Sequence, residues 1–282
     1  MTVSDAGGVV YVVATPIGNL EDLSPRAQRI LREVALIACE DTRHTALLCQ
    51  RYAITTPRVS LHAHNEAKRV PELLERLARG ESLALVSDAG TPLVSDPGER
   101  LVRAALDAGI AVVPVPGPSA VLAALVASGF ATRRFAFAGF LPRKGSERGE
   151  TLAALRGFPG TLVFFEAPNR AADTLVDLHA ALGPRRVALA RELTKRHESV
   201  LRGQLGELSL EELRGELTIV VEGPSDDART PAAPEELDAA ADRLLASGLS
   251  RRDAARRLAA ELGLPKRDAY ARVLARAKRG AS

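Results

Sequence analysis

Residues 39–44, Cys-Glu-Asp-Thr-Arg-His, bring two acids, a cation and an imidazole together directly after an expected strand. Such groups can position a hydroxyl nucleophile or remove its proton. We predict that Asp41, Arg43 and His44 are catalytic groups on the substrate side of a site. Two alternatives stay open, because Asp41 could cap the following helix with Arg43 paired to it, and His44 could be an ordinary surface residue.

Three further loops follow expected strands, at the sheet edge where α/β proteins bind ligands. Residues 14–20 contain a single glycine, so they lack the GxGxxG pattern of a nicotinamide site, and a rigid loop of this kind suits a ligand without phosphates. In residues 87–98, Asp88 could hold a hydroxyl or cationic group and Gly90 lets backbone approach a ligand, although an ordinary long turn is the alternative. Residues 114–120 carry three prolines and a helix cap at Ser119.

Basic residues of the second half could line a cleft for phosphates, with nearby glutamates pairing with some of them. These basic residues are Arg143, Lys144, Arg170, Arg191, Lys195 and Arg196. Among them we predict Arg143, Arg170 and Lys195 as contacts to the phosphates of a polyanionic partner and Lys144 as a catalytic group. A solvated charged face is the alternative for any single one.

The carboxyl-terminal part of the chain is strongly basic. From Arg243 to the end there are eleven Lys and Arg against three acids, on a chain whose net charge is +3, so a polyanionic partner is expected. The segment predicts three short helices that resemble a helix-turn-helix, with Ser250 and Asp253 starting the second. Its expected phosphate-binding residues are Arg251, Arg252, Arg256, Arg257, Lys266, Arg267, Arg272 and Arg276. Of these we single out Arg252, Arg256, Lys266 and Arg267; a merely solvated surface is the alternative.

The elements that must position these groups form two α/β patterns. Strand and helix signals alternate from residue 9 to residue 128, beginning with a continuous apolar run at 9–15 that is typical of a strand buried on both faces of a parallel sheet. Residues 139–149 interrupt the pattern and are expected to be a linker. We place one α/β domain at 1–138, a second at 150–225 and the helical extension at 235–282.

Composition excludes several classes of protein. The chain has 282 residues, of which 46% are hydrophobic and 26% charged, as in an ordinary globular protein with room for two domains. No apolar run approaches the roughly 20 residues that span a bilayer, and no signal peptide is recognisable. Cys39 and Cys49 are the two cysteines, and we expect reduced core thiols in a cytosolic protein.

Other chemistries have weaker support in the sequence. There is no tryptophan, and the three tyrosines and seven phenylalanines make an aromatic stacking platform for bases a weak expectation. Tyr270 has core spacing in the last helix, so we expect it to pack there. The sequence has no nucleophile elbow, P-loop or zinc pattern, and we expect no metal.

Seven motifs, met in order along the chain, resemble one family. They are VATPIGNLEDLSPRA, ACEDTRHT, SDAGTPLVSDPG, PVPGPSA, FAGFLPRKG, FFEAPNR and RELTKRHE. This combination, from about Val9 to Gly223, is similar to the ribosomal RNA small subunit methyltransferase I family, a branch of the tetrapyrrole methylases. The tail also resembles that family's extension.

The resemblance implies an α/β, two-domain tetrapyrrole-methylase-like (class III methyltransferase) fold with a small helical extension. It implies S-adenosylmethionine as cofactor and the 2′-hydroxyl of a cytidine in the decoding region of 16S rRNA as substrate, with the rRNA expected in the 30S subunit. It also implies a cytoplasmic homodimer. The cofactor-binding residues carried over by motif are Pro16, Asp88, Gly90, Thr91, Pro92, Val94, Ser119, Ala120, Phe165, Glu166, Glu192, Leu193 and Gly223.

Two other functions use the same fold. One is a small-molecule methyltransferase that acts on the carbon skeleton of a tetrapyrrole. The other is an RNA-binding protein that binds S-adenosylmethionine without turnover. The basic tail and the motifs of the second half favour the rRNA methyltransferase.

Overall fold

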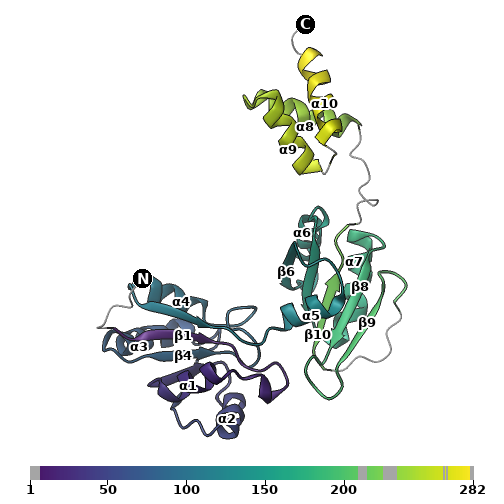
Figure 1. Cartoon of the computed structure of the whole chain (residues 1–282). Helices are drawn as coiled ribbons and strands as arrows, with labels where there is room; N and C mark the ends of the chain where they lie inside the picture. Colours follow the sequence, from purple (N-terminus) through teal and green to yellow (C-terminus); the bar gives the residue numbers. More distant parts are fainter. Residues whose placement is uncertain (1–6, 209–214, 225–233, 263, 265, 280–282) are drawn as a thin grey trace. The chain divides into compact units, whose positions relative to one another are not determined.

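The computed structural model describes residues 7–208, 215–224, 234–262, 264 and 266–279 (Figure 1). The chain divides into two compact units, Met1–Gly223 and Pro224–Ser282. The first unit contains two five-stranded sheets, and the second contains three helices. Among the described helices, no apolar stretch is long enough to span a lipid bilayer.

The first sheet is entirely parallel, as its alternating strands and helices predict. Its strands are β1 (Val9–Val13), β2 (Leu36–Cys39), β3 (Arg58–Ser60), β4 (Leu83–Val86) and β5 (Ala111–Val115), in the order β3-β2-β4-β1-β5. Every residue of β2 and β4 is buried, because helices cover both faces of the sheet.

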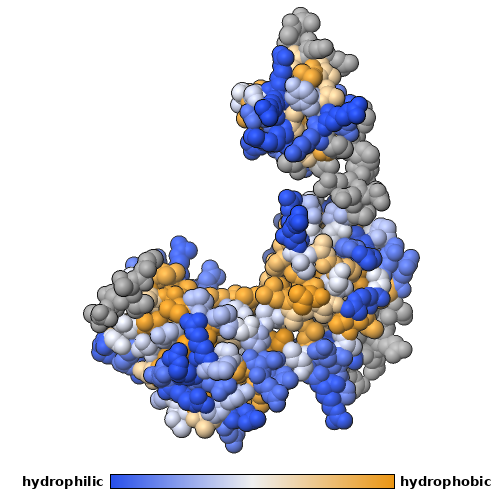
Figure 2. Space-filling view, in the orientation of Figure 1, coloured by the Kyte–Doolittle hydropathy of each residue, from blue (hydrophilic) through white to orange (hydrophobic). Residues whose placement is uncertain are grey.

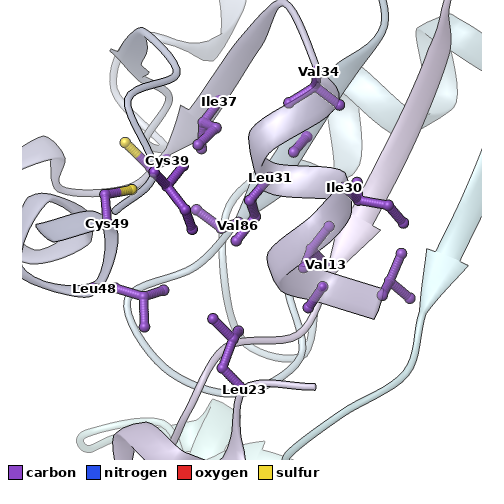
Figure 3. Close-up of a cluster of buried hydrophobic side chains, with 14 residues drawn as sticks. Val13, Leu23, Ile30, Leu31, Val34, Ile37, Cys39, Leu48, Cys49 and Val86 are labelled. Atoms are coloured by element: carbon purple, nitrogen blue, oxygen red, sulfur yellow. The ribbon is translucent and has the colours of Figure 1, made fainter. Parts of the chain in front are cut away.

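Each face of the first sheet has its own apolar core. The helices are α1 (Pro25–Glu33), α2 (Thr42–Arg51), α3 (Glu66–Ala78) and α4 (Glu99–Asp107). In Figure 1, α1 lies on one face of the sheet and α3 on the other. Side chains of α1 and α2, among them Leu31 and Leu48, belong to the same buried cluster as Ile37 of β2 (Figure 3). Cys39 and Cys49 are buried free thiols in this core, as predicted, and burial raises the pKa of Cys39 to about 11.

The second sheet is mixed. Its strands are β6 (Phe135–Phe140), β7 (Thr161–Glu166), β8 (Arg186–Arg191), β9 (Ser199–Gln204) and β10 (Leu217–Val221), in the order β6-β7-β10-β8-β9. Only β6 and β7 are parallel, and the other neighbours are antiparallel. One core beneath this sheet includes α7 (Ala171–Leu182) and α6 (Ser146–Arg156), and another includes α5 (Ala120–Ser128).

The stretch expected to be a linker, 139–149, has regular secondary structure at both ends. Residues 139–140 end β6, and residues from Ser146 onward begin α6. The glycines, proline and charges of this stretch are typical of a loop, but Phe135 and the residues after it pair in parallel with β7 and so belong to the second sheet.

The three-helix unit consists of α8 (Pro234–Ala246), α9 (Arg251–Leu262) and α10 (Lys266–Arg279) around an alanine-rich core. Ser250 caps α9 as predicted, since its hydroxyl accepts the backbone N–H of Asp253 at 3.1 Å. The packing predicted for Tyr270 is wrong, because its side chain is 44% exposed. Its neighbour Ala269 and Val273 occupy the core positions of α10 instead.

Candidate active site

The three loops singled out in the sequence lie side by side because β4, β1 and β5 are neighbours in a parallel sheet. Thr15 and Gly90 exchange two backbone hydrogen bonds, of 2.8 and 3.1 Å. The Thr91 hydroxyl donates to the carbonyl of Pro118 at 3.1 Å. These bonds hold the loops after all three strands as one surface.

Two loops store backbone strain. Among the described residues, five non-glycine residues have positive φ, and four of them belong to two loops. Leu93 (φ 74°) and Ser95 (φ 70°) follow β4, and Glu192 (φ 49°) and Thr194 (φ 67°) follow β8. Such conformations cost about 1–3 kcal/mol each and gather at functional sites. The strain therefore marks the same loops as the motifs do.

These loops border a cavity of about 450 Å³. From the first sheet and α5 it is lined by Ile17, Asp88, Ala89, Gly90, Thr91, Val94, Ser95, Asp96, Ser119, Ala120 and Val121. From the second sheet it is lined by Phe140, Phe165, Glu166, Ala167, Pro168, Ala190, Leu193, Gly215, Glu216, Leu217 and Thr218. Both α/β halves of the first unit thus contribute to one cavity.

Most of the predicted cofactor residues line this cavity. They are Asp88, Gly90, Thr91, Val94, Ser119, Ala120, Phe165, Glu166 and Leu193. The structure does not bring Pro16, Pro92, Glu192 or Gly223 to the lining. Ile17 lines the cavity in place of its neighbour Pro16, and Pro92 is buried. The carboxylate of Glu192 instead accepts the backbone N–H of Glu216 at 2.9 Å.

Gly223 is absent from the lining because β10 is antiparallel to its neighbours. Its amino end lies beside the carboxyl end of β7, where Leu217 pairs with Glu166. Gly223 follows the other end of β10 and lies against Gly160. Leu217 and Thr218 are therefore the lining residues that β10 supplies, and only the direction of the strand could have shown this.

Carboxylates crowd the first-sheet side of the cavity. Burial and the nearby Asp88 charge raise the pKa of Asp96, which lines the cavity. Burial, Asp88 and Asp96 together raise the pKa of Glu40. Sequence reasoning singled out neither acid, because both shifts depend on burial in the fold.

Asp41 caps the helix α2, which is one of the two alternatives that the sequence allowed. Its carboxylate accepts the backbone N–H of Arg43 at 2.8 Å and pairs with the Arg43 guanidinium at 2.7 Å, which holds its pKa well below the usual range. Its own N–H donates to Asp88 at 3.1 Å, so it supports a cavity residue. Arg43 and His44 are exposed and do not line the cavity.

Arg143, Lys144 and Arg170 line a second, open recess of about 1080 Å³, which shares Phe140 and Ala167 with the cavity. Arg143 and Lys144 are exposed, and neither has an acidic partner in the described part of the chain.

Arg170 has a different setting, because its guanidinium pairs with the buried Glu166 at 3.2 Å and donates to Leu141 at 2.7 Å. The same carboxylate of Glu166 also accepts the hydroxyl of Thr174 at 2.6 Å. Lys195 lies outside both recesses and pairs with Glu192 at 2.9 Å and Glu216 at 3.3 Å. Arg170 and Lys195 are therefore committed to ion pairs within the protein.

The cations of the basic tail also fall into two groups, those with an acidic partner and those without one among the described residues. Arg276 pairs with Asp238 and Asp242 of α8, and Arg272 pairs with Asp238 at 2.6 Å, so both hold α10 to α8. Arg256 pairs with Asp253 at 2.8 Å. The exposed residues without an acidic partner among the described residues are Arg251, Arg252, Lys266 and Arg267. Figure 2 shows hydrophilic residues across much of this unit.

The model of the Tetrapyrrole (Corrin/Porphyrin) Methylases matches residues 9–209. A protein of Synechocystis named ribosomal RNA small subunit methyltransferase I is 47% identical over 93% of this chain and 96% of its own length. The chain belongs to the ribosomal RNA small subunit methyltransferase I family. A family member from Haemophilus influenzae is 44% identical over 95% of this chain and 96% of its own length. The chain is accordingly a methyltransferase.

Solved structures agree on the fold. Diphthine synthase matches with a TM-score of 0.62 at 16% identity, over 77% of this chain and 91% of its own. The methyltransferase CobJ matches with a TM-score of 0.61 at 21% identity, over 77% of this chain and 94% of its own. Both likenesses confirm the two-sheet methyltransferase fold predicted from the sequence.

Proposed function

We propose that this chain transfers the methyl group of S-adenosylmethionine to the 2′-hydroxyl of a cytidine in the decoding region of 16S rRNA, within the 30S subunit. One observation carries the proposal: the cavity and the basic recess share the wall formed by Phe140 and Ala167. A ribose at the cavity would therefore have its phosphates close to Arg143 and Lys144. The names of the family's members support rRNA as the substrate.

The cavity fits the cofactor. Its volume of about 450 Å³ is that of a small-molecule site, and apolar residues such as Val94, Phe165 and Leu193 suit the adenosine and the carbon chain of the methionine part. Gly90, at φ 79°, brings backbone to the surface without a side chain, and Ser119 caps α5 at the edge of the cavity. When bound, the cofactor supplies a methyl group activated by a sulfonium.

A ribose hydroxyl needs a group that takes its proton. Asp96 lines the cavity, and its raised pKa makes it a better proton acceptor than Asp41, whose carboxylate is stabilised in the charged form by Arg43. We therefore propose that the Asp96 carboxylate accepts the proton of the ribose hydroxyl. Asp41 positions Asp88 instead, through its backbone N–H.

We infer a cytoplasmic homodimer. The exposed side of α5 is the evidence for a partner subunit. On the side that does not pack on the second sheet, Leu122 is 52% exposed and Val126 is 70% exposed. Figure 2 shows an apolar surface in the region of this helix. A surface of this kind is typical of a subunit contact.

The test is transfer of labelled methyl from S-adenosylmethionine to 30S subunits that lack the endogenous modification, followed by nuclease digestion and mass spectrometry. A 2′-O-methylcytidine product is expected. Methylation of a uroporphyrinogen without transfer to 30S subunits would favour the tetrapyrrole methyltransferase instead. Binding of RNA and cofactor without any transfer would favour the RNA-binding protein.

A further inference from the structure

Three of the seven phenylalanines gather at one edge of the cavity, which the count of aromatic residues could not reveal. The Phe165 ring lies 4.8 Å from the ring of Phe137 and 5.6 Å from that of Phe140. Phe137 and Phe165 are both half-buried, whereas Phe140 is 53% exposed. The cluster therefore presents one aromatic ring to solvent at the cavity.

A β-bulge determines where that ring lies. Phe137 pairs with Val163, so a regular strand would pair Phe140 with Glu166, but the register shifts and Phe140 pairs with Phe165. Gly139, at φ 64°, makes the shift possible, since other residues rarely adopt this conformation. A slip of one residue moves side chains to the other face of a strand, and bulges beside active sites re-aim side chains in this way.

Phe140 stands between two chemically different recesses. On one side the cavity offers Asp96 as a proton acceptor, and on the other the recess offers the unpaired cations Arg143 and Lys144. In a nucleotide, the ribose joins a phosphate to a base. The base is bonded directly to the ribose, so a ribose at the cavity places its base within reach of the cavity's edge, where Phe140 is exposed.

We propose that Phe140 is the platform on which the base of the target nucleotide stacks. This inference rests on the proposed function and names the part of the site that holds the acceptor. Stacking of a base on an aromatic ring contributes about 1–3 kcal/mol, so its loss should lower kcat/KM for RNA by about 5- to 140-fold.

The kinetic test compares Phe140→Leu, which keeps an apolar side chain but removes the ring, with Phe140→Trp, which keeps a ring. Phe135→Leu is the matched control, because Phe135 is 39% exposed on the same strand but lines neither recess. We expect Phe140→Leu alone to lower kcat/KM for 30S subunits. Because Phe140 also lines the cavity, the Kd for S-adenosylhomocysteine should change in Phe140→Leu by much less than kcat/KM does, and it should not change in Phe135→Leu.

Three results would overturn the proposal. If Phe140→Leu weakens S-adenosylhomocysteine binding as much as it lowers kcat/KM, the ring belongs to the cofactor site. If Phe140→Leu changes the oligomeric state in light scattering, the ring belongs to a subunit contact. Equal losses in Phe140→Leu and Phe140→Trp would likewise exclude stacking as the cause.

A second readout separates this inference from the proposed function. The chain has no tryptophan, so Phe140→Trp introduces a single indole whose fluorescence can be excited selectively, and Phe135→Trp is its control. Quenching of the indole fluorescence of Phe140→Trp by a fragment of 16S rRNA, but not by S-adenosylhomocysteine, is expected from base stacking. If the wild-type chain transfers no methyl but this quenching occurs, the proposed function fails and the platform stands; if RNA binds without quenching, the platform fails.

Discussion

The loops of the first sheet and the edge of the second sheet face the same cavity with different chemistry. The first-sheet loops are tied to one another by backbone hydrogen bonds and present Asp88 and Asp96. The second-sheet edge presents Phe140 and Phe165 and continues to Arg143 and Lys144. We propose a division of labour in which the first-sheet loops take the proton and, together with Phe165 and Leu193, hold the methyl donor, while Phe140, Arg143 and Lys144 hold the acceptor.

The largest effect is expected on the first-sheet side, from Asp96→Asn. Loss of a positioned proton acceptor lowers kcat by about 10²- to 10⁴-fold. The pKa of Asp96 is raised above about 4, the value for an ordinary aspartate. The wild-type rate should therefore fall on the acid side at a pH above about 4, as Asp96 becomes protonated. A pH profile of single-turnover transfer measures both.

The control for this variant is Glu40→Gln. Glu40 also has a raised pKa but does not line the cavity, so its replacement should leave most of the rate. A rate for Asp96→Asn within about three-fold of the wild type would exclude Asp96 as the proton acceptor, since that is far below the range for general base catalysis.

A second variant addresses donor binding on the same side. Gly90→Val places a branched side chain at φ 79° in the cavity lining, and we expect the Kd for S-adenosylhomocysteine to rise by about 5- to 140-fold, from about 1–3 kcal/mol of strain and lost space. Calorimetric titration measures this. Gly109→Val is the matched control, because Gly109 has φ 71° and open space around it away from the cavity. An equal loss in both variants would show a general effect on folding.

On the second-sheet side, replacing Arg143 and Lys144 together with alanine should weaken RNA binding and leave the donor in place. Two exposed ion pairs contribute up to about 1 kcal/mol each, so affinity should fall by up to about 30-fold. The slope of log affinity against log salt should become less steep by about 1.4, if both contact phosphates of single-stranded RNA. An unchanged slope would place the RNA elsewhere.

The last comparison is between a cation in an ion pair and an unpaired cation at this same edge, and the smallest effect is expected for the unpaired one. Arg170→Ala leaves the carboxylate of Glu166, whose side chain is 0% exposed, without its ion-pair partner. We expect the free energy of unfolding to fall by about 1–3 kcal/mol, measured by denaturant titration. Arg143→Ala should be neutral within about 0.5 kcal/mol, because Arg143 is exposed and unpaired in the described part of the chain. Equal losses would contradict this assignment.

The same contrast explains what the sequence could predict. Parallel strands buried on both faces appear as apolar runs, and each is followed directly by a loop at the ligand edge, so Asp88, Gly90 and Ser119 could be placed from motif and order. In the second sheet the directions of the strands decide which end faces the cavity. This is why Gly223 does not line the cavity and why Leu217, which does, was not predicted.

Properties that depend on burial or on a local shift could not be predicted. Asp96 lay within a motif, but only its burial beside Asp88 raises its pKa. Phe140 lay in the expected linker, and the bulge at Gly139 brings it to the junction. Asp41 and Arg43 are an ion pair at a helix cap, an arrangement that the sequence allowed but did not require.

Hydrogen–deuterium exchange of the full chain tests the division between the two sides most directly. S-adenosylhomocysteine alone should slow exchange at residues 89–98, which follow β4, and leave residues 141–148 unchanged. Addition of 30S subunits should then slow exchange at 141–148. Protection of 141–148 by S-adenosylhomocysteine alone, with 89–98 unaffected, would contradict the account.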